Sequence, residues 1–377
     1  MAPFQQFITQ RLQNRKEENS LRSLTTREGL IDFSSNDYLG LAQSESLFRL
    51  IQNKVEHLPH QNGATGSRLL SGNSSYTEQV EQTLAKIFNG EAALIFNSGY
   101  AANQGVLSSI PQKEDTIFYD ELAHACIRDG ARLSLATRFP FRHNDLNDLE
   151  SKLKKATGNI FVAVESIYSM DGDTCPLEAL VMLAEQYGAT IILDEAHSTG
   201  IMGKNGAGLA VSLGLESRIP MRIYTFGKGM GVHGACVVGS KLLTDYLINF
   251  ARTFIFTTAM APHSVASIAC AFEFLNANMH LQKELNQRIQ FFIDETEKQK
   301  VNRLSSSTQI QGIIIPGNDR IKRISNHMKD EGFDVRPILS PTVAKGSERI
   351  RICLHTDNTE EHIQQFVQHL SKLQSYA

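Results

Sequence analysis

Short apolar runs alternate with helical segments between about residues 75 and 240, and this alternation limits the possible folds more than any other feature. Residues 160–164 (Ile-Phe-Val-Ala-Val) and 189–193 (Ala-Thr-Ile-Ile-Leu) are rich in β-branched and apolar residues, as strands buried on both faces are. Similar runs occupy residues 92–96 and 222–226. The pattern predicts an α/β fold with a mostly parallel mixed sheet flanked by helices.

The segments before and after this region predict two smaller parts. The first 18 or so residues carry apolar side chains at helical spacing, which indicates an amphipathic helix in an arm. Beyond Pro262 a long helical stretch is expected to about residue 302, followed by alternating strand and helix signals. We therefore expect an N-terminal arm over residues 1–44, a large domain over 45–280 and a small C-terminal α+β domain over 281–377.

Composition narrows the class of function. A net charge of -3, from 37 basic and 40 acidic residues, gives no field that would gather nucleic acid or an anionic membrane. No stretch approaches the ~20 apolar residues of a membrane span, and the N-terminus lacks a signal-peptide pattern. Five widely spaced cysteines contain no C-x-x-C pair and so no zinc motif. We expect a cytoplasmic protein that acts on small molecules and has no metal in its active site.

Lys228 lies among glycines in Thr-Phe-Gly-Lys-Gly. The next residues, 229–234 (Gly-Met-Gly-Val-His-Gly), match the dinucleotide fingerprint G-x-G-x-x-G. In a nucleotide-binding unit a helix contains the last glycine, whereas residues 235–239 predict another strand, so the match fails. The lysine is then either part of an exposed turn or an amine that a flat cofactor can approach because Gly227, Gly229 and Gly231 leave the backbone bare.

A strand over residues 191–194 ends at Asp194, with His197 three positions on. In open α/β sheets ligands bind at the carboxyl ends of strands. A pyridoxal ring acts as an electron sink when its nitrogen is protonated, and a fixed carboxylate keeps it so, which makes Asp194 a candidate. His197 either hydrogen-bonds the phenolic oxygen of such a ring or caps the turn, and Glu195 is expected to face structure or solvent.

Two more segments place polar groups at the same rim of the sheet. His124 follows a strand-like run and can stack on a cofactor ring and meet substrate. Residues 97–103 (Asn-Ser-Gly-Tyr-Ala-Ala-Asn) turn a strand into a helix and present backbone N–H groups where a phosphate can bind. A tight packing turn is the alternative for this segment.

Together these segments resemble the α-oxoamine synthases, pyridoxal-phosphate enzymes of the aspartate-aminotransferase fold (fold type I) that join an amino acid to an acyl thioester and release carbon dioxide. The resemblance covers nearly the whole chain, including residues 33–41, 63–69 and 169–173. Residues 225–235 and 250–260 look most like the members that use L-alanine and a pimeloyl thioester, on CoA or acyl carrier protein, in biotin biosynthesis. Members that use glycine or serine share the core. A non-catalytic binding protein on this fold would have lost the chemical groups named above, and all of them are present.

The resemblance implies pyridoxal 5′-phosphate as cofactor, a homodimer with shared active sites, and a set of site residues. The implied catalytic residues are Lys228 as the Schiff-base lysine, Asp194 at the ring nitrogen, His197 at the phenolic oxygen and His124 stacked on the ring. The implied further cofactor contacts are Gly99, Tyr100, Ser169 and Thr225, with Thr257 and Thr258 reaching the neighbouring subunit's phosphate. The implied substrate contacts are Arg22, Asn36, His124, Thr342 and Arg351, of which Asn36 and Arg351 would hold the amino-acid carboxylate. Two departures are visible: Cys126 stands where the family usually has serine, and Thr77 where it usually has histidine.

Overall fold

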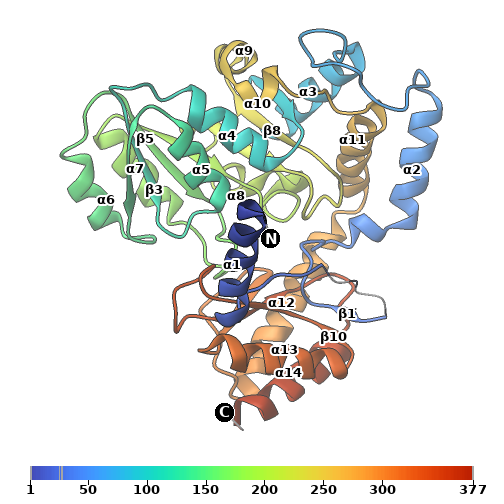
Figure 1. Cartoon of the computed structure of the whole chain (residues 1–377). Coiled ribbons are helices and arrows are strands. Elements are labelled where there is room, and N and C mark those ends of the chain that lie inside the picture. Colours follow the sequence, from blue (N-terminus) through green and yellow to red (C-terminus); the bar gives the residue numbers. More distant parts are fainter. Residues whose placement is uncertain (1, 25, 27–28, 376–377) are drawn as a thin grey trace. The chain divides into compact units, whose positions relative to one another are not determined.

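The computed structural model describes residues 2–24, 26 and 29–375 (Figure 1). The chain divides into two compact units, and each is described here by itself. The sheet unit comprises residues 36–169 and 174–283, and the small unit comprises residues up to 35, 170–173 and those from 284 onward. The three-part domain division expected from the sequence, with boundaries after residues 44 and 280, stays a proposal.

A seven-stranded sheet forms the centre of the sheet unit. Its strands, in spatial order, are β2 (Ala92–Phe96), β8 (Ala235–Gly239), β7 (Met221–Thr225), β6 (Ala189–Asp194), β5 (Ile160–Glu165), β3 (Thr116–Asp120) and β4 (Thr137–Phe141). β8 is antiparallel to both of its neighbours, and the other pairs are parallel. The prediction of a mostly parallel mixed sheet is confirmed, including the strand that follows the lysine turn.

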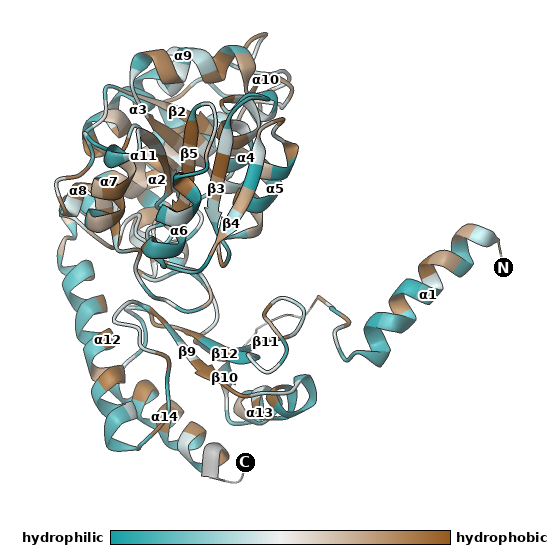
Figure 2. Ribbon diagram, turned by 90° about the vertical axis from the view of Figure 1, so that its left-hand side faces the viewer, coloured by the Kyte–Doolittle hydropathy of each residue, from teal (hydrophilic) through white to brown (hydrophobic). Residues whose placement is uncertain are grey.

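Helices cover both faces of this sheet, which explains its apolar strands. Ala163 of β5 belongs to one buried cluster and its neighbours Val162 and Val164 to another, so successive side chains enter opposite cores. Figure 2 shows β5 in brown, the colour of apolar residues. The first cluster contains residues of α4 (Gly99–Ser109), α5 (Ala125–Leu133), α9 (Lys241–Phe250) and α10 (Arg252–Ile255), and the second those of α6 (Leu146–Leu153), α7 (Leu177–Gln186) and α8 (Gly208–Ser212).

The helical stretch expected after Pro262 is present as two helices with a break at Asn278. Asn278 leaves the helical region with φ -127° and ψ 45°, and its side chain donates a hydrogen bond to the carbonyl of Phe274 at 2.9 Å. Asparagine competes in this way with the helical backbone pattern. The two helices are α11 (Pro262–Ala277) and α12 (His280–Lys298), of which α12 belongs to the small unit from residue 284 onward. The sheet unit also contains α2 (Glu45–Glu56), α3 (Ser75–Ile87) and the short 3₁₀ turns η1 (Leu41–Gln43) and η2 (Lys204–Gly206).

The small unit packs helices on short strands around a phenylalanine cluster. Phe366 stacks on Phe33 with ring centroids 4.3 Å apart and meets Phe333 edge-on at 5.4 Å. None of the residues of α1 is buried. Among the described residues, no helix is both long and apolar enough to cross a membrane. Besides most of α12, the unit's elements are α1 (Pro3–Glu17), β1 (Ile31–Asp32), β9 (Ile310–Ile314), α13 (Asn318–Asp330), β10 (Phe333–Asp334), β11 (Arg336–Ile338), β12 (Arg349–Cys353) and α14 (Glu360–Ser375).

Replacing Phe366 by alanine should lower the free energy of unfolding of the small unit by about 3–5 kcal/mol, because the ring is fully buried and its loss leaves a cavity. Phe7→Ala is the matched control, since that ring is 59% exposed, and it should change stability by less than about 0.5 kcal/mol. Urea unfolding followed by circular dichroism measures both. Equal effects of the two substitutions would contradict the assignment of Phe366 to the core.

Candidate active site

Two carboxylates lie side by side at the carboxyl edge of the sheet. β5 ends at Glu165 and β6 ends at Asp194, and the parallel register pairs these two residues directly. They are 2% and 4% exposed. The next strand, β7, ends at Thr225, so its side chain lies at the same edge. Parallel pairing therefore concentrates polar groups where α/β proteins bind ligands.

The Asp194 carboxylate is fixed by two donors. The side-chain amide of Asn103 donates to Oδ2 at 2.7 Å, and the backbone N–H of Ala196 donates to Oδ1 at 2.9 Å. Asn103 is fully buried in α4 and also donates to the carbonyl of Gly99 at 3.0 Å. Sequence reasoning missed this residue as a functional one, because an asparagine one turn into a helix does not indicate a buried partner. These bonds hold Asp194 in one orientation.

Lys228 lies in the turn between β7 and β8 and contacts His197. The lysine Nζ is 2.9 Å from Nε2 of His197, and the hydroxyl of Tyr38 is 2.7 Å from Nδ1 of the same ring. Both ring nitrogens therefore contact side chains, which favours the site role of His197 over the turn cap. Tyr38 is fully buried and was not singled out from the sequence. The chain thus places an amine, an imidazole and a phenol in one row.

The glycines around Lys228 are needed mainly for chain packing. A Cβ on Gly231, where φ is +65°, would overlap the backbone of Ala42, and one on Gly229 would approach the carbonyl oxygen of Thr199 to 2.7 Å. At Gly227, by contrast, a Cβ would have room, with its nearest neighbour at 3.8 Å. Chain packing is therefore a further reason for glycine at 229 and 231, and the expectation that these glycines let a cofactor approach stays a prediction. The dinucleotide interpretation is also excluded, because β8 follows the last glycine.

The N-terminus of α4 offers donors for an anion. Its first residue, Gly99, packs so closely on Thr225 that a Cβ would overlap the threonine hydroxyl. The preceding Asn97 donates from its side chain to Oγ1 of Thr257 at 3.2 Å and to the carbonyl of Thr258 at 3.0 Å. A helix N-terminus with adjacent hydroxyls suits a phosphate. Tight packing and a helix N-terminus, the two alternatives for segment 97–103, are thus present together.

His124 is the N-cap of α5 and is linked to the buried carboxylate. Its backbone N–H donates to Oε1 of Glu165 at 2.6 Å, and its Nδ1 lies 2.9 Å from Sγ of Cys126. Loss of water around the ring, and then nearby Lys228, lower the pKa of His124. Burial raises the pKa of the Cys126 thiol, which stays protonated and can donate to the imidazole as a serine hydroxyl would. The departure at Cys126 thus preserves a donor.

The other predicted residues of the sheet unit make contacts of their own. The Tyr100 hydroxyl donates to Asp129 at 2.5 Å, and this bond raises the tyrosine pKa. Ser169 is buried after β5, and Asn36 accepts a hydrogen bond from the Tyr38 hydroxyl at 3.0 Å. Glu195 is fully buried and accepts backbone N–H groups at the start of α8, so its structural role is as expected.

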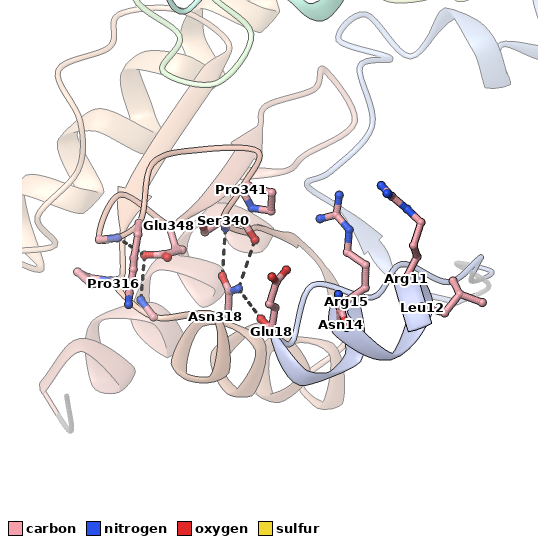
Figure 3. A pocket seen from close by; sticks show the side chains of 13 residues that line it. Arg11, Leu12, Asn14, Arg15, Glu18, Pro316, Asn318, Ser340, Pro341 and Glu348 are labelled. Carbon is pink, nitrogen blue, oxygen red and sulfur yellow. Dashed lines mark hydrogen bonds between the residues drawn. The ribbon is translucent and has the colours of Figure 1, made fainter. Parts of the chain in front are cut away.

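The small unit carries the remaining predicted substrate residues. Arg22 donates to Oγ1 of Thr342 at 3.2 Å, so the structure brings these two together. Next to Thr342 lies a hollow of about 1150 Å³ lined partly by Ser340 and Pro341 and by α1. Figure 3 shows the arginines of α1 along one side of it. Arg351 lies on β12, where its guanidinium is 2.9 Å from Sγ of Cys353.

The donor set of the sheet unit matches the polar groups of pyridoxal phosphate. The amine of Lys228 suits the aldehyde carbon, and the fixed carboxylate of Asp194 suits the ring nitrogen. The N-terminus of α4 suits the phosphate. The residues present therefore fit this cofactor.

Comparison with known proteins agrees with this fit. The model of the family "aminotransferase class I and II" matches residues 28–370. An 8-amino-7-oxononanoate synthase of Emericella nidulans is 39% identical over 94% of this chain and 92% of its own length. The crystal structure of the synthase of this name from Francisella tularensis is 29% identical with a TM-score of 0.79, covering 93% of this chain and 99% of that one. A serine palmitoyltransferase of S. paucimobilis with bound PLP–myriocin aldimine has a TM-score of 0.90 at 23% identity, covering 100% and 99% of the two chains, and shows the fold alone.

Glu165→Gln should flatten the dependence of stability on pH. Burial, and then the charge of Asp194, raise the pKa of Glu165 from 4.5 to about 8. A carboxyl group with a raised pKa favours the folded state fully below pH 4.5, and this contribution is lost as the pH rises towards about 8. Glutamine keeps an acceptor for the His124 N–H and cannot ionise. Urea unfolding of the cofactor-free protein between these pH values should therefore show a free energy of unfolding that declines with pH in the parent but not in the variant. Parallel plots of this free energy against pH for the two proteins would refute the raised pKa of Glu165.

Proposed function

Because the chain belongs to the class I and II aminotransferase family and has the type I fold of pyridoxal-phosphate enzymes, we propose that it is an 8-amino-7-oxononanoate synthase. The proposed reaction joins L-alanine to a pimeloyl thioester, with loss of carbon dioxide, in biotin biosynthesis. The observation that carries the proposal is the contact between Lys228 and His197, close to Asp194 at the end of β6. The chain that makes this contact is similar to such a synthase over 94% of its length.

Bound pyridoxal phosphate would supply an electron sink for the carbanion formed at the α-carbon of alanine. Asp194 would keep a proton on the ring nitrogen, and Asn103 would keep the carboxylate turned towards it. Ser169, Thr225, Gly99 and Tyr100 would complete the cofactor's contacts. His197 would face the phenolic oxygen, and His124 would cover the ring.

Lys228 is proposed to have two tasks, holding the cofactor and moving the α-proton of alanine. Its Nζ is positioned by Nε2 of His197, whose other nitrogen contacts Tyr38. This second contact fixes which nitrogen faces the lysine. A site closed to water would favour a neutral lysine amine over an ammonium ion, as a proton acceptor requires.

The substrate and assembly are proposed from the same set of residues. Asn36 and Arg351 would hold the carboxylate of alanine, and the pair Arg22 and Thr342 would meet the acyl substrate on CoA or acyl carrier protein. Thr257 and Thr258 would reach the phosphate in the partner subunit of a cytoplasmic homodimer. A site of this kind would be complete only in the dimer.

Replacing Lys228 by alanine should abolish the covalent cofactor. The purified parent protein should be yellow, and borohydride should fix the cofactor on the peptide that contains Lys228, as mass spectrometry would detect. Arg218→Ala, on an exposed ion pair with Glu185, is the control and should keep both properties. A parent protein that stays colourless with added cofactor would refute the proposal.

Thiol release should be fastest with L-alanine and a pimeloyl thioester. The same assay with glycine and acetyl-CoA tests a 2-amino-3-ketobutyrate ligase, and serine with palmitoyl-CoA tests a serine palmitoyltransferase. Asp194→Ala should lower kcat by at least about 100-fold in this assay, because the electron sink then loses its fixed carboxylate. A preference for glycine with acetyl-CoA would overturn the assignment within the family.

A further inference from the structure

Three side chains able to bind a metal converge on the surface of the small unit. His327 and Glu331 lie one helical turn apart at the end of α13, and His369 lies on α14. Their ligand atoms all lie within 4.8 Å of one another. Nε2 of His327 is 3.8 Å from Oε1 of Glu331, and Nδ1 of His369 is 3.7 Å from Oε2 of the same carboxylate. None of these residues belongs to the site described above.

We propose that this cluster binds one transition-metal dication, with Zn²⁺ as the best fit, and thereby links α13 to α14. Zinc binds imidazole nitrogen and carboxylate oxygen at roughly 2.0–2.2 Å in a tetrahedron, which places neighbouring ligand atoms about 3.4 Å apart. The two imidazole–carboxylate separations, 3.8 Å to Oε1 and 3.7 Å to Oε2, are close to this value, and the two imidazoles offer nitrogens within 4.8 Å of each other, so rotation of these exposed side chains can close the site. Two imidazoles disfavour Mg²⁺ and Ca²⁺, which take oxygen ligands.

The backbone and the core hold the ligands near these positions. The i, i+4 spacing puts His327 and Glu331 on one face of the helix. The ring of His369 lies 6.0 Å from that of Phe333, whose side chain is 2% exposed and packs on Phe366. The third ligand thus comes from a helix anchored in the core of the unit and not from a loop. Figure 1 shows α13 and α14 side by side, as their contacts confirm.

A pair of ordinary surface ion pairs is the competing explanation. Both histidines would then have to be protonated and share one carboxylate, and exposed pairs of this kind contribute little to stability. A metal needs the imidazoles neutral and uses both at once. Within the described part of the chain, this is the one group of at least three such residues whose ligand atoms lie this close. No zinc motif is visible along the chain, because the ligands come from two helices that are separate in the sequence.

Two measurements on the untagged holoenzyme test the proposal. They are isothermal titration calorimetry with Zn²⁺ and the visible absorption of bound Co²⁺. One ion should bind per chain, and His327→Ala and His369→Ala should each weaken binding by at least about tenfold, since even outer-shell losses cost that much. His362→Ala is the matched control, a partly buried histidine of α14 outside the cluster, and should bind as the parent does. The five cysteines are all buried and do not compete for the ion.

The link between the helices has its own measurement. Zn²⁺ should raise the Tm and slow amide hydrogen exchange in α14 of the parent and of His362→Ala, but not of His369→Ala. Binding that persists in the double variant His327→Ala/His369→Ala would place the ion elsewhere and overturn the site. Binding at the site without slower exchange in α14 would overturn the link.

Discussion

The rest of the sheet unit depends on two buried carboxylates that lie next to each other at the ends of neighbouring parallel strands. Glu165 and Asp194 are brought together by sheet register alone, and two like charges so placed cannot both ionise without partners. The surrounding chain supplies those partners. Asn103 and a backbone N–H each donate a hydrogen bond to Asp194, whereas Glu165 accepts one N–H and has a raised pKa. The environment thus separates the two groups into one fixed carboxylate and one that holds its proton.

This arrangement also explains why the reactive amine sits where it does. Lys228 follows β7, the strand next to the one that ends in Asp194, and its turn leads directly into the antiparallel β8. A hairpin is a rigid way to hold a long side chain, and the Tyr38–His197 pair then restrains its tip. A strand, and not the helix of a dinucleotide loop, follows this turn. The reversal into that strand therefore helps to position the lysine.

The sequence predicted the large features of the fold because they depend on local patterns. Apolar runs identified β2, β5, β6 and β8 almost to the residue, since strands buried on both faces are nearly continuous runs of apolar residues. Residues that act through distant contacts were not predictable in this way. Tyr38 and Asn103 meet His197 and Asp194 through the fold, and nothing in their neighbouring residues indicates the partner. The break after α11 was missed because a single asparagine ends a helix without a proline or glycine to mark it.

Because every cysteine is buried, the cysteines can report how often the structure around them opens. Cys353 lies on β12 of the small unit, and Cys126 lies on α5 of the sheet unit. A thiol-reactive probe can reach either residue only when the surrounding structure opens, so labelling rates report how often each unit does so. The labelling rates of these two natural residues therefore report the opening of the two units separately, without an engineered cysteine.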